Sequence, residues 1–139
     1  MFDQSSLLWK PLFSLEEADI VVLGVPYEGG VTARKGTVNA PKAVRKWFKD
    51  YWTFDIDRKE DFTDKKIVDL GDVRIGKSFR ETAINVSKAV DFIQEKNKDA
   101  KILILGGDHS ITSLFTNPLE VRSFLVLDAH FDLLDNFNG

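Results

Sequence analysis

The chain has 139 residues, of which 43% are hydrophobic and 29% charged, and this balance is ordinary for one globular domain. Its formal net charge of −3 and pI of about 5.4 give no electrostatic basis for binding nucleic acid or an anionic membrane surface, so we expect neither partner. The sequence contains no cysteine, which excludes disulfides, thiolate nucleophiles and cysteine-ligated metal sites. No run approaches the roughly 18 apolar residues of a membrane span, and the N-terminus lacks a signal-peptide pattern, so we expect a cytoplasmic protein.

Short aliphatic runs alternate with amphipathic stretches along the chain. The aliphatic runs predict four buried strands, over residues 19–25, 66–73, 101–105 and 123–127. Helical spacing, with start signals at Asn39 and at the Ser78-Phe79-Arg80-Glu81 capping box, predicts helices over 41–48, from 78 to about 98, and within 110–122. The charged segment 53–65 is predicted to be an excursion at the sheet edge. This order predicts one α/β domain over residues 1–139, with three α/β/α layers and a mostly parallel sheet.

The only two histidines each follow a predicted strand and lie among carboxylates. His109 stands in Gly106-Gly107-Asp108-His109-Ser110, and His130 stands in Asp128-Ala129-His130-Phe131-Asp132. Side chains just past the carboxyl ends of parallel strands converge on one crevice, so we expect both histidines at one edge of the sheet. Asp128, His130 and Asp132 alternate along the chain, so on an extended backbone they point to one side.

This joint pattern favours a metal site. Taken alone, an Asp-His pair after a strand would be interpreted as a turn with a structural histidine, but two such clusters together favour metal ligation. Imidazole and carboxylate donors without sulfur suit manganese, ahead of magnesium, iron, nickel or zinc. A carboxylate bridging two ions would fit a two-metal site that activates water. Asp108 precedes its histidine and would point away from the ion, so we predict that it orients the imidazole from the second shell.

The glycine-rich stretch after the first strand, residues 25–36, lacks both the P-loop and the dinucleotide-binding patterns. It is therefore predicted to be a tight surface loop with Arg34 exposed to solvent. The aromatic side chains that follow are expected to be partly core and partly an oligomer surface or a bare face, and they are Trp47, Phe48, Tyr51, Trp52 and Phe54.

The two histidine segments resemble the first two metal signatures of the ureohydrolase family, which includes arginase, agmatinase and formiminoglutamase. Weaker features of that family also occur in order: Gly24-Val25-Pro26-Tyr27 leading to Arg34 and Gly36, then Pro41 with Arg45, then Asp69-Leu70-Gly71-Asp72-Val73. The resemblance runs from about residue 19 to 135. It implies an arginase/deacetylase-like α/β/α fold that is incomplete at its C-terminus, so we expect the chain to be the N-terminal half of such a domain.

By this resemblance, two Mn²⁺ ions would be bound, one by His109 and the other by His130. Asp128 would bridge them and Asp132 would complete the first. The implied reaction is hydrolysis of a guanidino compound to urea and an amine. Asp132-Leu133-Leu134-Asp135 is similar to the agmatinase pattern, which favours agmatine and its conversion to putrescine, with arginine, guanidinobutyrate or formiminoglutamate as alternative substrates. Leu134 departs from the arginine common at that place in agmatinases.

The family also uses a later strand with two more metal-binding aspartates, a proton-shuttling histidine and a glutamate for the guanidinium. None of these has a match here, so the catalytic residues are expected beyond residue 139. We therefore expect this fragment alone to be inactive and prone to associate, and the complete protein to be a homo-oligomer. The alternative is a non-catalytic relic or associating subunit with the same fold.

Overall fold

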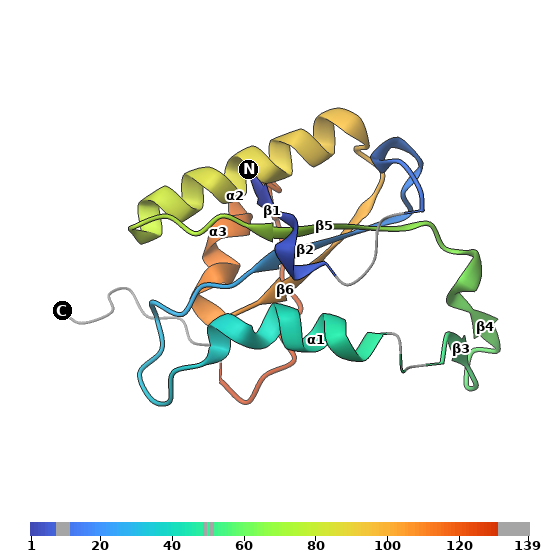
Figure 1. Cartoon of the computed structure of the whole chain (residues 1–139), viewed down its shortest axis with the longest axis horizontal. Coiled ribbons are helices and arrows are strands. Elements are labelled where there is room, and N and C mark those ends of the chain that lie inside the picture. Colours follow the sequence, from blue (N-terminus) through green and yellow to red (C-terminus); the bar gives the residue numbers. More distant parts are fainter. Residues whose placement is uncertain (8–11, 49, 51, 131–139) are drawn as a thin grey trace.

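The computed structural model describes residues 1–7, 12–48, 50 and 52–130. A four-stranded sheet in the order β1-β5-β2-β6 forms its centre, and a separate two-stranded sheet pairs β3 with β4 (Figure 1). The strands are β1 (Phe2–Asp3), β2 (Ile20–Val25), β3 (Phe54–Asp55), β4 (Glu60–Asp61), β5 (Ile67–Val73) and β6 (Lys101–Gly106). The α-helices are α1 (Ala40–Phe48), α2 (Phe79–Lys96) and α3 (Ser113–Thr116). Five short 3-10 helices complete the described elements: η1 (Gln4–Ser6), η2 (Leu15–Glu17), η3 (Thr37–Asn39), η4 (Phe62–Asp64) and η5 (His109–Thr112).

The central strand β2 pairs in parallel with both neighbours. Ile20 lies opposite Ile67 of β5 and opposite Lys101 of β6, and the β6 register continues without a break to Val25 and Gly106. Such central parallel strands are covered on both faces, which explains why the last five residues of β2 are all buried. The carboxyl ends of β2, β5 and β6 therefore meet at one edge of the sheet, as the sequence predicts.

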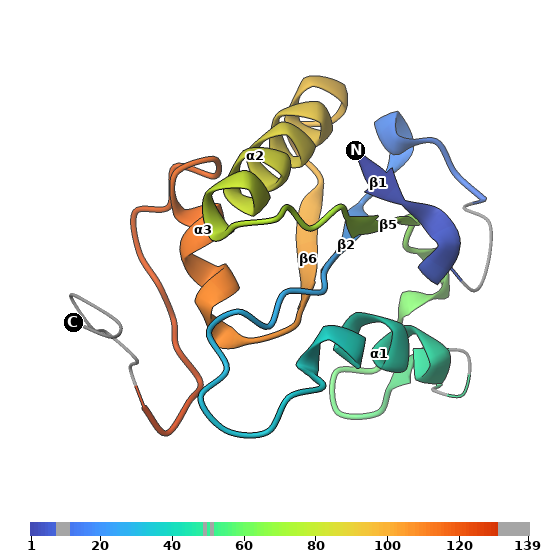
Figure 2. The ribbon, with the colours of Figure 1, turned by 60° about the vertical axis from the view of Figure 1, so that its left-hand side comes forward.

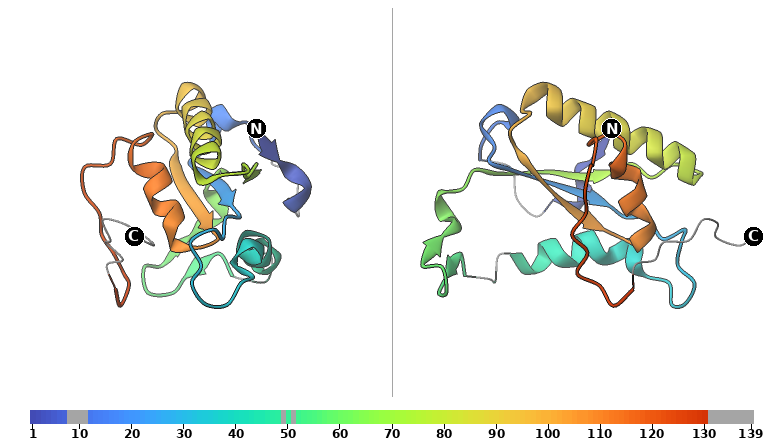
Figure 3. Two further views of the ribbon diagram at one scale, coloured as in Figure 1. Left: turned by 90° about the vertical axis from the view of Figure 1, so that its left-hand side faces the viewer. Right: turned by 180° about the vertical axis from the view of Figure 1, so that it is seen from behind.

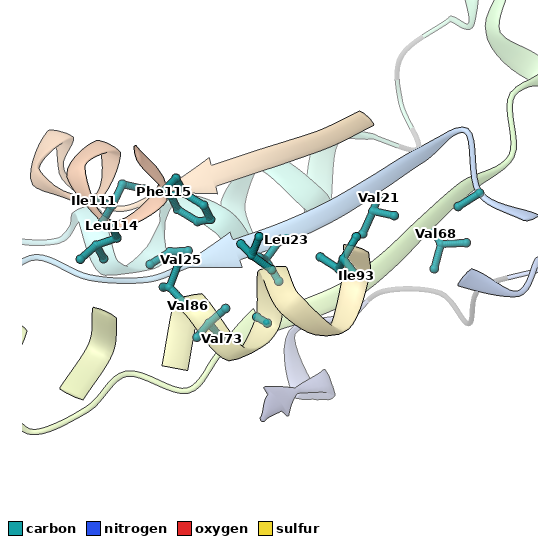
Figure 4. Packing of buried hydrophobic residues seen from close by; sticks show 13 residues of the cluster. Val21, Leu23, Val25, Val68, Val73, Val86, Ile93, Ile111, Leu114 and Phe115 are labelled. Carbon is teal, nitrogen blue, oxygen red and sulfur yellow. The ribbon is translucent and has the colours of Figure 1, made fainter. Parts of the chain in front are cut away.

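Helices cover both faces of the sheet, which confirms the three-layer prediction. Figure 2 shows α2 on one face and α1 on the other, and Figure 3 shows the same layering from two further sides. The core lies mainly between β2 and α2, where Val21, Leu23 and Val25 point toward Val86 and Ile93 (Figure 4). The α2 N-terminus is also as predicted, because the Ser78 hydroxyl oxygen accepts a hydrogen bond from the Glu81 amide at 3.1 Å.

Helix α1 occurs where it was predicted, but its apolar stripe does not face the sheet. Pro41 and Arg45 are its buried residues, whereas Val44 and Trp47 are exposed. The predicted N-cap is wrong, because Asn39 lies inside η3 immediately before the helix. Burial of Arg45 is possible because two carboxylates of β5 pair with it, so an ion pair rather than an aliphatic ridge attaches this helix to the sheet.

The fourth predicted parallel strand is wrong. Residues 123–127 form no strand, and β6 stays at the edge of the sheet. Their side chains are largely in solvent, with Leu125 88% and Leu127 91% exposed. A strand requires paired backbone groups and covered apolar side chains, but no described strand pairs with this segment, and Leu125 and Leu127 are left almost uncovered. The predicted Thr53–Lys65 excursion contains the β3–β4 hairpin and η4.

Three of the aromatic side chains expected at a surface, Trp47, Trp52 and Phe54, are exposed. Phe48 is partly buried, and Tyr51 lies outside the described residues. Within the described part of the chain, no helix is both long and apolar enough to cross a membrane.

Candidate metal centre

The first histidine segment begins as β6 ends, and it lies against the loop that follows β2. The Gly107 amide donates to the Val25 carbonyl at 3.0 Å, and the Asp108 amide donates to the Tyr27 carbonyl at 2.9 Å. A Cβ atom on Gly107 would overlap the Tyr27 carbonyl oxygen, so this close approach of two backbones requires glycine. The parallel pairing of β2 and β6 is thereby extended to the residue before His109.

Asp108 is the N-cap of η5, the helix that starts at His109. One carboxylate oxygen accepts hydrogen bonds from the Ser110 amide, at 3.0 Å, and from the Ser110 hydroxyl, while the other accepts from the Gly30 amide at 2.7 Å. Both oxygens are therefore used by neighbouring backbone and hydroxyl groups. The predicted role of Asp108 in orienting the imidazole stays a prediction.

The second histidine segment reaches the first despite the missing strand. The Asp128 Oδ2 atom lies 4.0 Å from His109 Nδ1, and both side chains are a little over 40% exposed. The His130 amide donates to Asp128 Oδ1 at 3.0 Å, which closes a tight turn. This hydrogen bond, assisted by the nearby imidazoles of His109 and His130, lowers the pKa of Asp128 below its usual value of 3.8. His109 and the described residues 128–130 thus lie together near the predicted edge of the sheet.

The donor pair is suited to an ion. Neighbouring ligands about 2.1 Å from one tetrahedral or octahedral ion are about 3.0–3.4 Å apart, so His109 Nδ1 and Asp128 Oδ2, at 4.0 Å, would have to approach by less than about 1 Å to share an ion. An imidazole and an ionised carboxylate are also the donors that manganese accepts. Among the described residues, no group of three or more His, Cys, Asp or Glu side chains could hold a metal. His130 is exposed, and Asp132 lies outside the described residues.

An ion pair joins Arg45 of α1 to Asp69 and Asp72 of β5, two segments that the metal prediction did not use. The Arg45 Nε donates to Asp69 Oδ2 at 2.7 Å, its Nη2 donates to Asp69 Oδ1 at 3.0 Å, and its Nη1 pairs with Asp72. Burial by itself would lower the pKa of Arg45, but the hydrogen bonds that its guanidinium donates to the two aspartates, together with their negative charges, outweigh burial and raise it. Both segments were noted in the sequence among the weaker ureohydrolase features. Their spacing along the chain, however, did not indicate that Arg45 and Asp69 form an ion pair.

An apolar cleft of about 310 Å³ lies between β6, the η5–α3 segment and the chain leading to Phe124. Ile104, Phe115 and Leu119 are among its lining residues, and no charged side chain lines it. A guanidinium ion would lose its hydration there without gaining a carboxylate partner, so the cleft is a poor site for such a substrate. Arg34 is exposed, as predicted.

Comparison with known proteins identifies the family. The model of the family described as Arginase family matches residues 18–139, nearly the whole chain. The chain belongs to the arginase family. This confirms the resemblance to the ureohydrolases, and the match includes both histidine segments.

Two relatives illustrate the likeness. The agmatinase of Pyrococcus horikoshii is 32% identical over 130 residues, covering 93% of this chain and 46% of that protein. The N(1)-aminopropylagmatine ureohydrolase of Thermococcus kodakarensis is 30% identical over 128 residues, covering 91% of this chain and 44% of that protein. The chain thus spans about half the length of these relatives.

A solved structure of the formiminoglutamase from Trypanosoma cruzi with Mn²⁺ shares the fold. Its TM-score is 0.66 at 22% identity, over 76% of this chain and 36% of that one. The sequence and fold comparisons therefore agree on the arginase fold.

Proposed function

We propose that this chain is part of a manganese-dependent ureohydrolase whose substrate is agmatine. The observation that carries the proposal is the approach of His109 and Asp128, because these residues come from the two family signatures and lie 4.0 Å apart. Membership of the arginase family gives the reaction class, and the Mn²⁺ in the T. cruzi neighbour supports the metal. The reaction would consume agmatine and water and release putrescine and urea.

In this proposal, His109, Asp128, His130 and Asp132 hold the metal. When bound, a pair of manganese ions would bring the pKa of water near neutrality, so that hydroxide is available to attack the guanidinium carbon. The chain's own residues prepare the donors. The turn from Asp128 to His130 lowers the pKa of the Asp128 carboxyl group, and the backbone bonds around Gly107 and Asp108 fix where η5 and His109 begin.

Agmatine is the preferred substrate for two reasons. The agmatinase of P. horikoshii is among the similar relatives, and Asp132-Leu133-Leu134-Asp135 is similar to the agmatinase pattern except for Leu134 in place of arginine. The aminopropylagmatine enzyme shows that a longer agmatine derivative is also accepted within the family. Agmatine, aminopropylagmatine, arginine and guanidinobutyrate should therefore be compared for urea release, and formiminoglutamate for glutamate release.

The experiment is a turnover assay on the native protein with and without added Mn²⁺. We expect manganese-dependent urea release that is fastest with agmatine. His109→Asn and Asp128→Asn should each abolish manganese binding and urea release, whereas Asp61→Asn in the distant hairpin should change neither. Urea release from arginine alone would contradict agmatine as the substrate. Turnover by Asp128→Asn equal to that of the unchanged protein would contradict the proposed metal site.

The alternative function is a non-catalytic subunit. The lack of a group of three metal donors among the described residues favours it, and so do the exposed apolar residues of the 124–127 segment. Calorimetric titration with Mn²⁺ distinguishes the two, since such a subunit would take up no manganese. For residues 1–139 alone we expect no urea release and self-association. The homo-oligomeric state of the native protein and its cytoplasmic location stay predictions, which light scattering and cell fractionation test.

A further inference from the structure

The carboxylate of Asp108 joins two segments that are 78 residues apart. Its Oδ2 atom accepts a hydrogen bond from the Gly30 amide at 2.7 Å, and its Oδ1 atom accepts from the Ser110 amide at 3.0 Å. Gly30 belongs to the glycine-rich loop between β2 and α1, whereas Ser110 follows His109 in η5. One charged group thus satisfies backbone donors on both sides of the contact, and such bonds to an ionised acceptor are stronger than neutral ones.

The surrounding contact leaves little freedom for either segment. Backbone bonds from Gly107 and Asp108 to Val25 and Tyr27 continue the β2–β6 pairing into the loop. A Cβ atom on Gly30 would lie 3.0 Å from the Cβ atom of Ser110, so the loop also packs closely against η5. Figure 2 shows the loop after β2 running beside the turn after β6. The start of η5, which carries His109, is therefore set by the loop as well as by its own helix cap.

We propose that Asp108 is a positioning residue that fixes the glycine-rich loop and His109 relative to each other. The inference rests on the proposed metal site, and it gives Asp108 a different task from orienting an imidazole. Because Asp108 caps the helix that begins at His109, loss of its charge would loosen that backbone and release the Gly30 amide in one step. The loop would then border the metal centre in a fixed place only while Asp108 accepts hydrogen bonds from both segments.

The test is Asp108→Asn, with Asp61→Asn as the matched control. Asparagine has nearly the same size but only one acceptor oxygen, so it can cap η5 or hold Gly30 but not both. Asp61 is also the N-cap of a 3-10 helix, where its carboxylate accepts a hydrogen bond from the Thr63 amide at 2.9 Å. It lies in the β3–β4 hairpin. The control therefore removes the same kind of cap without touching the loop or His109.

Two readouts on the native protein are needed: Mn²⁺ affinity by calorimetry and amide hydrogen exchange at Gly30 and Ser110. In Asp108→Asn we expect exchange at Gly30 to accelerate about tenfold, and Mn²⁺ affinity to fall about 10- to 100-fold, the range seen when groups that orient metal ligands are lost. Asp61→Asn should change neither. The milder Ser110→Ala variant removes one donor to Asp108 and should lower Mn²⁺ affinity about threefold, which keeps the test decisive if Asp108→Asn does not fold.

The outcomes separate this inference from the proposed function. Unchanged exchange at Gly30 in Asp108→Asn would overturn the link, and faster exchange with unaltered Mn²⁺ affinity would overturn the positioning of His109. If the unchanged protein takes up no manganese, the proposed function fails. The exchange rates at Gly30 and Ser110 then still decide whether Asp108 holds the loop and η5 together.

Discussion

Replacing Arg45 by methionine should strongly destabilise the folded protein. The Arg45 side chain is fully buried, and so is its partner Asp69. Methionine fills a similar volume but leaves the Asp69 carboxylate without its cation, while the Gly71 amide still donates to it at 2.9 Å. Leaving one buried charge unpaired in this way costs about 3–5 kcal/mol. That is a large part of the 5–15 kcal/mol of a typical domain.

The assay is urea denaturation of the native protein followed by circular dichroism. The control is Lys46→Met, which removes an exposed cation from the next position of α1 and should change the free energy of unfolding by less than about 0.5 kcal/mol. The double variant Arg45→Met with Asp69→Asn removes the stranded charge as well. It should therefore be at least about 1 kcal/mol more stable than the sum of the two single effects predicts.

Arg45→Lys tests geometry at constant charge. A lysine ammonium cannot reproduce the fork that contacts both oxygens of Asp69 and also Asp72, so we expect an intermediate loss of about 1–3 kcal/mol. A loss below about 1 kcal/mol in Arg45→Met, or strict additivity in the double variant, would refute the view that this ion pair attaches α1 to the sheet.

Three further predictions concern packing, backbone approach and pH. Leu23→Ala should lower the free energy of unfolding by about 2–5 kcal/mol, because Leu23 is fully buried. Leu103→Ala on the adjacent strand should lower it much less, because Leu103 is 45% exposed. Equal shifts of the denaturation midpoint in the two variants would contradict the assigned core. Gly107→Ala should cost about 1–3 kcal/mol, since the new methyl would overlap the Tyr27 carbonyl, and a melting temperature like that of the unchanged protein would exclude that backbone contact. The stability of the fold should decline as the pH falls below about 4.5, because hydrogen bonds lower the pKa of several carboxyl groups in the folded state. Each of these groups stabilises the fold at a pH above its unfolded pKa of 3.8 or 4.5. This stabilisation is lost as the pH falls through the lower pKa of the folded state. These groups are Asp3, Glu17 and Asp61. Denaturation midpoints measured from pH 7 to 3 test this, and a rise on acidification would contradict it.

The sequence alone was sufficient for the local elements near the site. The aliphatic runs of β2 and β6 are short and nearly continuous, β5 keeps aliphatic residues around Asp69 and Asp72, and the Ser78 cap marks the start of α2. Local sequence patterns were therefore enough to predict these elements. The two histidine segments were also recognisable without a structure, because metal ligands have restrictive chemistry and short spacing. The family followed from them, and the comparisons confirm it.

Only the tertiary structure decided what depends on distant partners. Residues 123–127 have the composition of a buried strand, yet no described element pairs with them or covers them, so composition was misleading there. Arg45 was noted in the sequence only as part of a weaker family feature, and the position of Asp69, 24 residues later, makes its burial favourable. Asp108 was predicted from spacing to orient an imidazole, and that role stays a prediction. The structure adds a contact of its carboxylate with the Gly30 amide, 78 residues away, which spacing could not indicate. Burial and hydrogen-bond partners of this kind arise from chain segments brought together by folding, and sequence spacing carries no record of them.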